Sequence, residues 1–302
     1  MGKHKKLNAI LPMLLRDYER FEILNKSLNK FCHDLIDVCW VITRDSEYRE
    51  LHRKINNNFY KVIPESMIIP ELRFWRFIKR APSGWHVQQI IKLAIAQKVQ
   101  TDFYLTLDSD VVCIRPVVYE DLIRNGRALS TIEPDIHPDW YRDAERLLGI
   151  PRSGLSHGVT PAILNRHAVI ELQEFLTQRF LIQKANPVLR ALRVLSSVFP
   201  SNSVLNQSLF SWRSFLIGNT PWTEYSLYNT FLEGKNIFEK YHIRGGRNCI
   251  YGVDHSVWYE KHWPDWNLKE ALNGEGFFIV IQSNTKLPAR SVWDKVRKHL
   301  EA

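Results

Sequence analysis

The sequence predicts an α/β fold in which helices flank a mainly parallel central sheet. The first of three observations predicts the fold, and the other two describe a globular chain without a cysteine framework. Strand-like and helix-like segments alternate along the early part of the chain, which is typical of parallel sheets. The 302 residues are 45% hydrophobic and 24% charged, as in globular proteins. The four cysteines include no CxxC pair, so we expect neither a disulfide framework nor a cysteine zinc site.

The first elements of the chain alternate between strand and helix. Residues 8–12 form a short apolar strand, and residues 17–31 carry apolar side chains at helical spacing. Residues 34–43 contain a β-branched run bounded by polar residues, which predicts a buried strand. Residues 59–63, which end at Pro64, are predicted to add another strand.

A helix and a strand then lead to two acidic residues. An Ala-Pro-Ser-Gly turn precedes residues 85–97, whose apolar side chains repeat at helical spacing. Residues 103–107 form an apolar strand that ends at Asp108. Because ligands bind at the carboxyl ends of strands in such sheets, we expect the functional site beside Asp108 and Asp110.

The later part of the chain is predicted to be more helical. Residues 166–199 have a helical pattern that is broken at Pro187. Residues 188–199 fit either a buried helix with one solvated stripe or a helix on a membrane surface. Residues 277–281 predict a strand. No internal repeat is visible, so we expect one domain over residues 1–302.

The net charge of +9 indicates an anionic partner. Nucleic acid, an anionic membrane surface or a phosphorylated substrate would each fit. Because the Lys and Arg residues are dispersed and no nucleic-acid-binding motif is present, we expect no nucleic-acid partner. No apolar segment approaches the roughly 20 residues that span a bilayer, and the first residues lack the apolar region of a secretory signal. We therefore expect a cytoplasmic chain.

The motif Asp108-Ser109-Asp110 is a candidate metal site. Two carboxylates separated by one residue can turn toward a single divalent cation, and oxygen ligands suit Mg²⁺ or Mn²⁺. Such an ion would neutralise the charge that develops on a diphosphate leaving group. The alternative is a turn whose two acidic side chains only cap backbone groups.

Four motifs carry a resemblance to a known family: GWHVQQIIKLAIA, LDSDVVCIRP, PWTEYSLYNTF and VIQSNT. In order and spacing they resemble bacterial glycosyltransferases of the GT-A fold that are associated with surface polysaccharide assembly and contain a DxD pair. The GT-A fold is a Rossmann-like nucleotide-diphospho-sugar transferase fold. The resemblance covers nearly the whole chain. It implies a nucleotide-sugar-binding half at residues 1–116 and an acceptor-binding half at residues 117–302, with a helical insertion near residues 166–216.

The resemblance implies a metal-dependent enzyme that transfers a sugar, with inversion, from a nucleotide sugar to a hydroxyl of a glycan or lipid-linked acceptor. Asp108 and Asp110 match the pair that binds Mn²⁺ or Mg²⁺, with Asp110 as the direct ligand and Asp108 as a contact to metal or ribose. His255 would be a third metal ligand, and the alternative is a structural histidine. A UDP-sugar is the first choice of donor and a GDP-sugar the second.

The resemblance also implies donor contacts away from the acidic pair. Gln89 and Lys92 lie about one helical turn apart, where related enzymes place a polar or basic contact to the donor. The strand from Ala9 to Pro12 would flank the nucleotide base. These residues would together hold the nucleotide sugar.

On the acceptor side, the resemblance implies a loop at residues 153–165 that leads into a helix. His157 and Thr160 would face the acceptor from this loop. Pro161 suits the first residue of a helix, so helix-start chemistry is the alternative role of Thr160.

Glu224 is the predicted catalytic base. It follows a capping threonine and resembles the acid at a helix start that inverting GT-A enzymes use to accept the hydroxyl proton. The alternative is an acid that is favoured only by the helix dipole. Trp222 would stack on the acceptor sugar. The reserve candidates for the base are Glu133, Asp254 and Glu260.

Two other functions fit parts of the sequence. LTLDSDVV also fits the opening of haloacid-dehalogenase-like phosphatases with Asp108 as nucleophile, which requires a downstream acidic pair. Asp135 and Asp139 are the nearest candidates for that pair. A non-enzymatic binder of anionic polymer would explain the charge but not the acidic motif. For a lipid-linked acceptor, we expect a basic chain to contact the cytoplasmic face of an anionic membrane peripherally.

Overall fold

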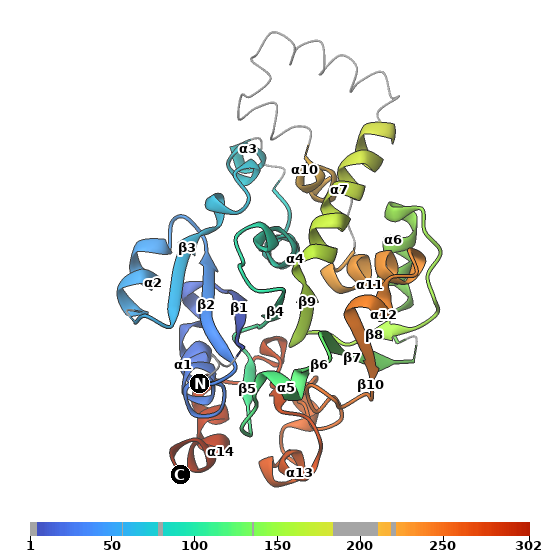
Figure 1. The fold of residues 1–302 in the computed structure, drawn as a ribbon. Helices are drawn as coiled ribbons and strands as arrows, with labels where there is room; N and C mark the ends of the chain where they lie inside the picture. Colours follow the sequence, from blue (N-terminus) through green and yellow to red (C-terminus); the bar gives the residue numbers. More distant parts are fainter. Residues whose placement is uncertain (1–4, 56, 78–80, 135, 184–210, 219–221) are drawn as a thin grey trace.

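A five-stranded sheet lies at the centre of the fold (Figure 1). The structure is a computed structural model that describes residues 5–55, 57–77, 81–134, 136–183, 211–218 and 222–302. The strands of the sheet are β1 (Leu7–Pro12), β2 (Ile36–Thr43), β3 (Tyr60–Pro64), β4 (Phe103–Thr106) and β9 (Ala162–Asn165). Their order is β3–β2–β1–β4–β9, with β9 antiparallel to β4 and the other neighbours parallel. The predicted α/β class with a mainly parallel central sheet is confirmed.

The central strand β1 is buried along its whole length. Its residue Ile10 lies opposite Trp40 of β2 and Thr106 of β4. Because helices cover both faces of the sheet, a near-continuous apolar run is what such a strand requires. Since β1, β2 and β4 are parallel, their carboxyl ends lie along one edge, which is where the chain places Asp108.

The two faces of the sheet are covered by different helices. Ala9 and Leu11 of β1 pack in one core cluster with the apolar side of α1 (Tyr18–Phe31). Ile10 packs in another cluster, to which helices α4 (Gly84–Ala94), α7 (Arg166–Gln183) and α11 (Glu224–Gly234) contribute along with others. The helices predicted over residues 17–31 and 85–97 are confirmed, the second ending in a 3-10 turn at Ile95–Gln97.

Smaller sheets complete the fold. β5 (Val111–Cys113) pairs antiparallel with β11 (Phe278–Val280), which confirms the strand predicted near the C-terminus. β7 (Arg127–Glu133) pairs with β6 (Ile123–Arg124), β8 (Ser156–His157) and β10 (His242–Gly245). The remaining helices are α2 (Tyr48–Lys54), α3 (Glu71–Phe77), α5 (Tyr119–Leu122), α6 (Pro138–Leu148), α10 (Trp212–Ile217), α12 (Phe238–Tyr241), α13 (Leu268–Asn273) and α14 (Ala289–Glu301).

One predicted helix start is wrong. Pro161 does not begin a helix but directly precedes β9, and α7 begins only at Arg166. The reason is tertiary, because residues 162–165 pair with the edge of β4 that would otherwise be unpaired. The helix predicted over residues 188–199 lies outside the described residues, as does much of the helical insertion predicted near residues 166–216.

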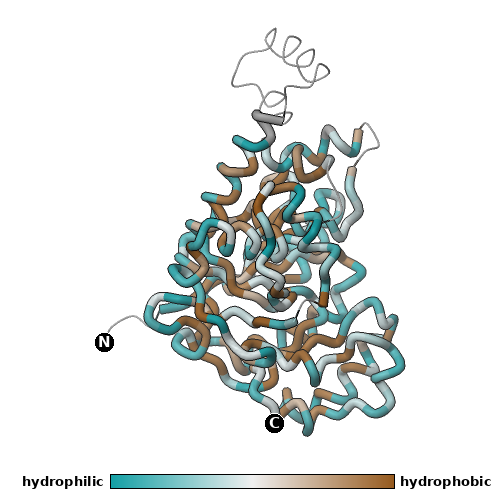
Figure 2. Tube along the Cα trace, turned by 90° about the vertical axis from the view of Figure 1, so that its right-hand side faces the viewer, coloured by the Kyte–Doolittle hydropathy of each residue, from teal (hydrophilic) through white to brown (hydrophobic). Residues whose placement is uncertain are grey.

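Apolar segments concentrate in the middle of the trace, where the sheet lies, and hydrophilic segments follow its outside (Figure 2). All four cysteines are free thiols, in line with the prediction of no disulfide framework. In the part of the chain that the structure describes, no helix combines the length and apolarity that a membrane span requires.

Candidate functional site

Asp108 and Asp110 lie in the turn between β4 and β5, at the carboxyl edge of the parallel strands. The Asp110 Oδ2 accepts a hydrogen bond of 2.8 Å from the backbone N–H of Ser283. The Asp110 carbonyl accepts another, of 3.0 Å, from the N–H of Ile281. The segment that follows β11 therefore fixes the orientation of the acidic pair, although it is far away in the sequence.

The electrostatics of the pair favour a cation. Burial and the neighbouring carboxylate of Asp108 raise the pKa of Asp110 to about 6, while the Ser283 N–H and the Arg20 guanidinium act in the opposite direction. A positive charge placed between two neighbouring carboxyl groups stabilises the ionised form of both. The pair is therefore a strong attractor for a cation.

Lys92 joins the acidic pair to the start of α11. Its Nζ lies 3.0 Å from Asp108 Oδ1 and 3.1 Å from Glu224 Oε1. It also donates a hydrogen bond of 2.8 Å to the Thr160 hydroxyl. Burial by itself lowers the pKa of Lys92. The carboxylates of Asp108 and Glu224 together raise it by more, so the pKa lies well above its usual range. The side chain is therefore a buried ammonium that is shared by two carboxylates.

Glu224 is the first residue of α11 and is 1% exposed. The hydroxyl of the capping residue Thr223 accepts the N–H of Ser226, and the Glu224 N–H donates to Gln89 Oε1 over 3.3 Å. Burial raises the pKa of Glu224, and the Lys92 ammonium opposes that rise. The Lys92 ammonium is the one charged donor that approaches the Glu224 carboxylate among the described residues, at Oε1. The other oxygen, Oε2, has no hydrogen-bond partner there and is available to a ligand.

Two clefts meet at this cluster. We name them the basic cleft, of about 510 Å³, and the aromatic cleft, of about 460 Å³. Both are lined by Trp85, Gln89, Asp108, Asp110 and Gln282. A molecule that extends from one cleft into the other must therefore pass the acidic pair.

The basic cleft runs along the carboxyl ends of β1 and β2. Pro12 and Thr43, the last residues of these strands, line it. Three guanidinium side chains, from Arg16, Arg44 and Arg76, line it as well. Arg76 is paired with the carboxylate of Glu65, so its charge is partly neutralised. Four carboxylates, from Asp17, Glu65, Asp108 and Asp110, line the cleft as well. A phosphate-bearing ligand at these strand ends would therefore depend on a cation at the acidic pair in addition to the guanidinium groups.

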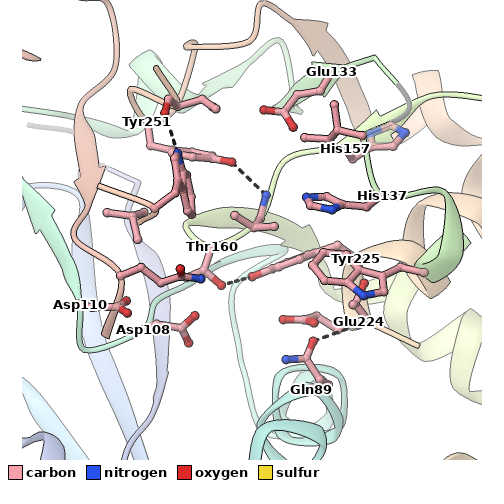
Figure 3. A pocket seen from close by; sticks show the side chains of 18 of the residues that line it. Gln89, Asp108, Asp110, Glu133, His137, His157, Thr160, Glu224, Tyr225 and Tyr251 are labelled. Carbon is pink, nitrogen blue, oxygen red and sulfur yellow. Dashed lines mark hydrogen bonds between the residues drawn. The ribbon is translucent and has the colours of Figure 1, made fainter. Parts of the chain in front are cut away.

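The aromatic cleft extends from the acidic pair toward β7 and β8 (Figure 3). Its aromatic side chains are Trp85, His137, Trp140, Tyr141, His157, Tyr225, Tyr251, Trp258 and Tyr259. Its carboxylates, besides the acidic pair, are those of Glu133 and Glu224. Aromatic faces with a few convergent polar groups are typical of small-molecule sites.

Most of the residues that the sequence singled out come together here. Those that line the aromatic cleft are Gln89, Lys92, Asp108, Asp110, His157, Thr160 and Glu224, and Pro12 lines the basic cleft. His157 is almost fully buried, and burial lowers its pKa despite the nearby Glu233. Of the reserve candidates for the base, Glu133 lines the aromatic cleft, whereas Asp254 and Glu260 are exposed and line neither cleft.

Three predicted site residues, Ala9, Trp222 and His255, line neither cleft. Ala9 is fully buried in the core and its side chain lines neither cleft. Trp222 is fully buried as well, and its Nε1 donates to the Leu216 carbonyl over 3.2 Å, so the prediction that it stacks on an acceptor sugar is wrong. The physical reason is that the Trp222 side chain packs into the apolar core that it shares with α10 and α11.

His255 is not brought to the acidic pair. Its ring packs beside Gly252 and Gly274, where an added Cβ on Gly274 would lie 2.9 Å from Nε2. It lines neither cleft. Within the described ranges, no group of three or more His, Cys, Asp or Glu side chains could hold a metal ion. A third ligand for an ion at the acidic pair would therefore have to be an amide, a hydroxyl or a ligand oxygen.

Sequence reasoning missed the walls of the aromatic cleft. Trp85, Trp140, Arg247, Tyr251 and Tyr259 all line it. The abundance of tryptophan, 10 in 302 residues, is a sequence signal for Trp85 and Trp140 alone among these five. Composition cannot separate these side chains from buried ones such as Trp222.

Comparisons with known proteins give a family and two distant structural similarities. Mouse xyloside xylosyltransferase 1 in its apo form has a TM-score of 0.45 and 11% identity, over 94% of this chain and 100% of that chain. The apo-form glycosyltransferase GlyE of Streptococcus pneumoniae TIGR4 has a TM-score of 0.41 and 11% identity, over 98% of this chain and 62% of that chain. Neither similarity is strong enough to assign a function. No curated protein sequence matches the chain. The model of a family of unknown function, DUF6492, matches residues 4–302, and the chain belongs to that family.

Proposed function

We propose that the protein is a metal-dependent glycosyltransferase that moves a sugar from a nucleotide sugar to an acceptor hydroxyl. The observation that carries this proposal is the meeting of a basic cleft and an aromatic cleft at Asp108 and Asp110. A nucleoside diphosphate needs positive charge, whereas a sugar needs flat apolar faces and hydrogen-bonding groups. The two clefts supply these properties on opposite sides of one acidic pair.

The basic cleft is the proposed donor site. A nucleoside would lie against the ends of β1 and β2 at Pro12 and Thr43, with its diphosphate toward Arg16 and Arg44. The sugar would then lie beside Asp108 and point into the aromatic cleft. UDP-sugars and GDP-sugars are the donor classes that we propose to test first.

The residues at the acidic pair fit a divalent cation. Asp108 and Asp110 both line the two clefts where these meet, and the only cation paired with Asp108 among the described residues is Lys92, on Oδ1. Asp108 and Asp110 would hold the ion, with the Gln282 amide as a nearby oxygen donor, a set that suits Mn²⁺ or Mg²⁺. Such an ion, when bound, neutralises charge on a leaving diphosphate.

Glu224 is the proposed base. Its carboxylate lines the aromatic cleft, its Oε2 has no hydrogen-bond partner among the described residues, and burial raises its pKa, which makes it a better proton acceptor. The acceptor hydroxyl gives its proton to Glu224 and its oxygen bonds to the anomeric carbon, while the bond from that carbon to the diphosphate breaks. Lys92 holds the Glu224 carboxylate in place. This route inverts the anomeric centre.

Among the residues that the structure describes, the candidate for the second acidic pair of a phosphatase does not lie at the site. Asp139 has a side chain that is 78% exposed and is paired with Arg142 on the surface of α6. It lines neither cleft, and Asp135 lies outside the described residues. Asp108 is, in addition, paired with Lys92, which suits a ligand-holding carboxylate better than a nucleophile.

The proposed pathway is the assembly of a surface polysaccharide at the cytoplasmic face of a membrane. The net charge of +9 supports a peripheral contact with anionic lipid. Binding to vesicles that contain anionic lipid at low salt, and release at high salt, is the expected result. A protein that stays unbound at low salt would contradict this part of the proposal.

The test of the proposed function is nucleotide-dependent thermal stabilisation. We expect UDP or GDP to raise the melting temperature in the presence of Mn²⁺ and not in the presence of EDTA. Equal melting temperatures with and without nucleotide in Mn²⁺, for every nucleoside diphosphate tried, would reject the proposal. An anionic-polymer binder would show that second result.

A further inference from the structure

Glu133 ends β7 and contributes a buried carboxylate to the aromatic cleft. It is only 4% exposed, and its Oε1 accepts no hydrogen bond from any described residue. Leaving a buried polar group without a partner destabilises a protein, and leaving a charged one destabilises it more. A ligand that donates a hydrogen bond to Glu133 would recover this cost.

Arg247 lies beside Glu133 but does not satisfy it. Its Nη1 is 3.9 Å from Glu133 Oε1, which is beyond hydrogen-bonding distance. Its Nε is instead held by Asp254 Oδ1 at 3.0 Å, and Asp254 Oδ2 accepts a bond from Asn248. The guanidinium is thus anchored at the rim, with a gap between it and Glu133. A hydroxyl group can bridge this gap, because it donates to a carboxylate and accepts from a guanidinium at once.

Flat aromatic faces line the same cleft. The rings of His137 and Trp140 stack with their centroids 4.1 Å apart, and those of Trp85 and Trp140 are 6.2 Å apart. Trp85 and Tyr259 are 42% and 64% exposed, which is high for such large side chains. A sugar ring has an apolar C–H face that packs on an aromatic ring and an edge of hydroxyls that needs hydrogen-bonding partners.

We infer that the Glu133 end of the aromatic cleft is a saccharide subsite, in which Glu133 and Arg247 bind a hydroxyl of the acceptor and the aromatic side chains pack on its ring. In the view of Figure 3, Glu133 and His157 lie on one side of the cleft, and Asp108 and Asp110 lie on the other. The inference rests on the proposed function and adds to it that the acceptor itself is a saccharide. Glu133 is then a specificity-determining residue and Glu224 keeps the role of base.

The chemistry of this subsite disfavours other acceptor groups. An alkyl alcohol has a single hydroxyl, which as the acceptor must face Glu224, so no hydroxyl would be left for Glu133. A phosphate of a lipid headgroup would place negative charge against the Glu133 carboxylate. A neutral ligand with at least two hydroxyls can place one at Glu224 and another between Glu133 and Arg247.

The experiment is a titration of a panel of methyl glycosides, with octanol and inorganic phosphate as comparators, followed by saturation-transfer NMR on the full chain. At least one methyl glycoside should bind the wild type, and Glu133→Gln should weaken it about tenfold, because a charge-assisted hydrogen bond becomes a neutral one. Glu239→Gln, an exposed carboxylate outside the cleft, is the matched control and should bind as the wild type does.

Three results overturn the inference: no methyl glycoside binds the wild type, the glycosides bind both variants equally, or octanol or phosphate competes with the glycosides. A circular dichroism spectrum of Glu133→Gln that matches the wild type excludes misfolding, and Glu133→Asp is the second variant if it does not match. Binding of UDP with Mn²⁺ to the wild type, measured in parallel, tests the proposed function separately. Glycoside binding without UDP binding would reject the transferase and keep the subsite.

Discussion

The Lys92 ammonium lies 3.1 Å from the Glu224 carboxylate, in an ion pair whose two side chains are 2% and 1% exposed. Lys92→Met would leave that carboxylate buried without its cation, which typically costs about 3–5 kcal/mol. We expect urea denaturation to show a loss of this size in the free energy of unfolding. Lys269→Met, on the exposed side of α13, should change it by less than about 0.5 kcal/mol.

The same comparison can separate a charge effect from lost packing. The double variant Lys92→Met/Glu224→Gln removes both charges and should recover much of the stability that the single variant loses. If the double variant is as unstable as Lys92→Met alone, the contribution of Lys92 comes from packing and the electrostatic account of this cluster is wrong.

Stability should fall in acid because of His242. This side chain is buried, and its Nε2 lies 2.7 Å from the Tyr228 hydroxyl. Burial, with the nearby His157 as a smaller cause, lowers the pKa of His242 to about 3. The unfolded state then binds more protons than the native state between about pH 6.5 and pH 3, so the stabilising effect is complete above pH 6.5 and is lost as the pH falls toward 3.

The variant His242→Gln should lack this part of the pH dependence. Urea denaturation at pH 7 and pH 5 should show a smaller loss of stability for the variant, with a difference of at most about 1.4 kcal/mol per pH unit. His33→Gln, on the exposed surface, should keep the wild-type dependence. Identical pH profiles for the wild type and His242→Gln would refute the assignment of a neutral buried histidine.

Arg44 should contribute to nucleotide binding. It follows β2 and lines the basic cleft, so Arg44→Gln removes a positive charge from the proposed diphosphate site. We expect the affinity for UDP or GDP with Mn²⁺ to fall by about tenfold, as for the loss of a charge-assisted hydrogen bond. Arg49→Gln, in α2 and away from the cleft, serves as control. An unchanged affinity for Arg44→Gln would place the nucleotide elsewhere.

Glu224→Gln should slow turnover strongly and leave donor binding intact. The amide keeps the shape of the side chain but cannot accept a proton, so release of nucleotide from the donor should slow by roughly two orders of magnitude or more. Glu120→Gln, an exposed residue of α5, is the control. Near-normal turnover of Glu224→Gln, or a product that retains the anomeric configuration of the donor, would refute the role of Glu224 as base.

Local patterns in the sequence predict the central sheet and the acidic pair. Apolar runs over residues 8–12, 34–43 and 103–107 are strands in the structure, because strands covered on both faces cannot contain many unpaired polar groups. Asp108 and Asp110 stand out since they follow such a run directly. The capping pattern before Glu224 likewise predicts the start of α11.

Long-range packing determines what the patterns miss. The contact of Lys92 with Glu224 depends on α4 lying against α11, and no spacing in the sequence encodes that approach. The burial of Trp222 follows from the core that α10 and α11 share, which an aromatic residue beside an acid does not reveal. Pro161 precedes a strand because β9 completes the edge of β4. In each case tertiary pairing overrides the local signal.

The most direct test of the central claim is a calorimetric titration of UDP, and then of GDP, into the wild type and Asp110→Ala, each with Mn²⁺ and with EDTA. The account predicts binding of one nucleotide per chain to the wild type with Mn²⁺, and loss of that binding both in EDTA and in Asp110→Ala. Asp34→Ala, whose side chain is exposed far from both clefts, should bind as the wild type does. Equal affinity of the wild type and Asp110→Ala in Mn²⁺ would contradict the claim that the nucleotide is held through a cation at the acidic pair.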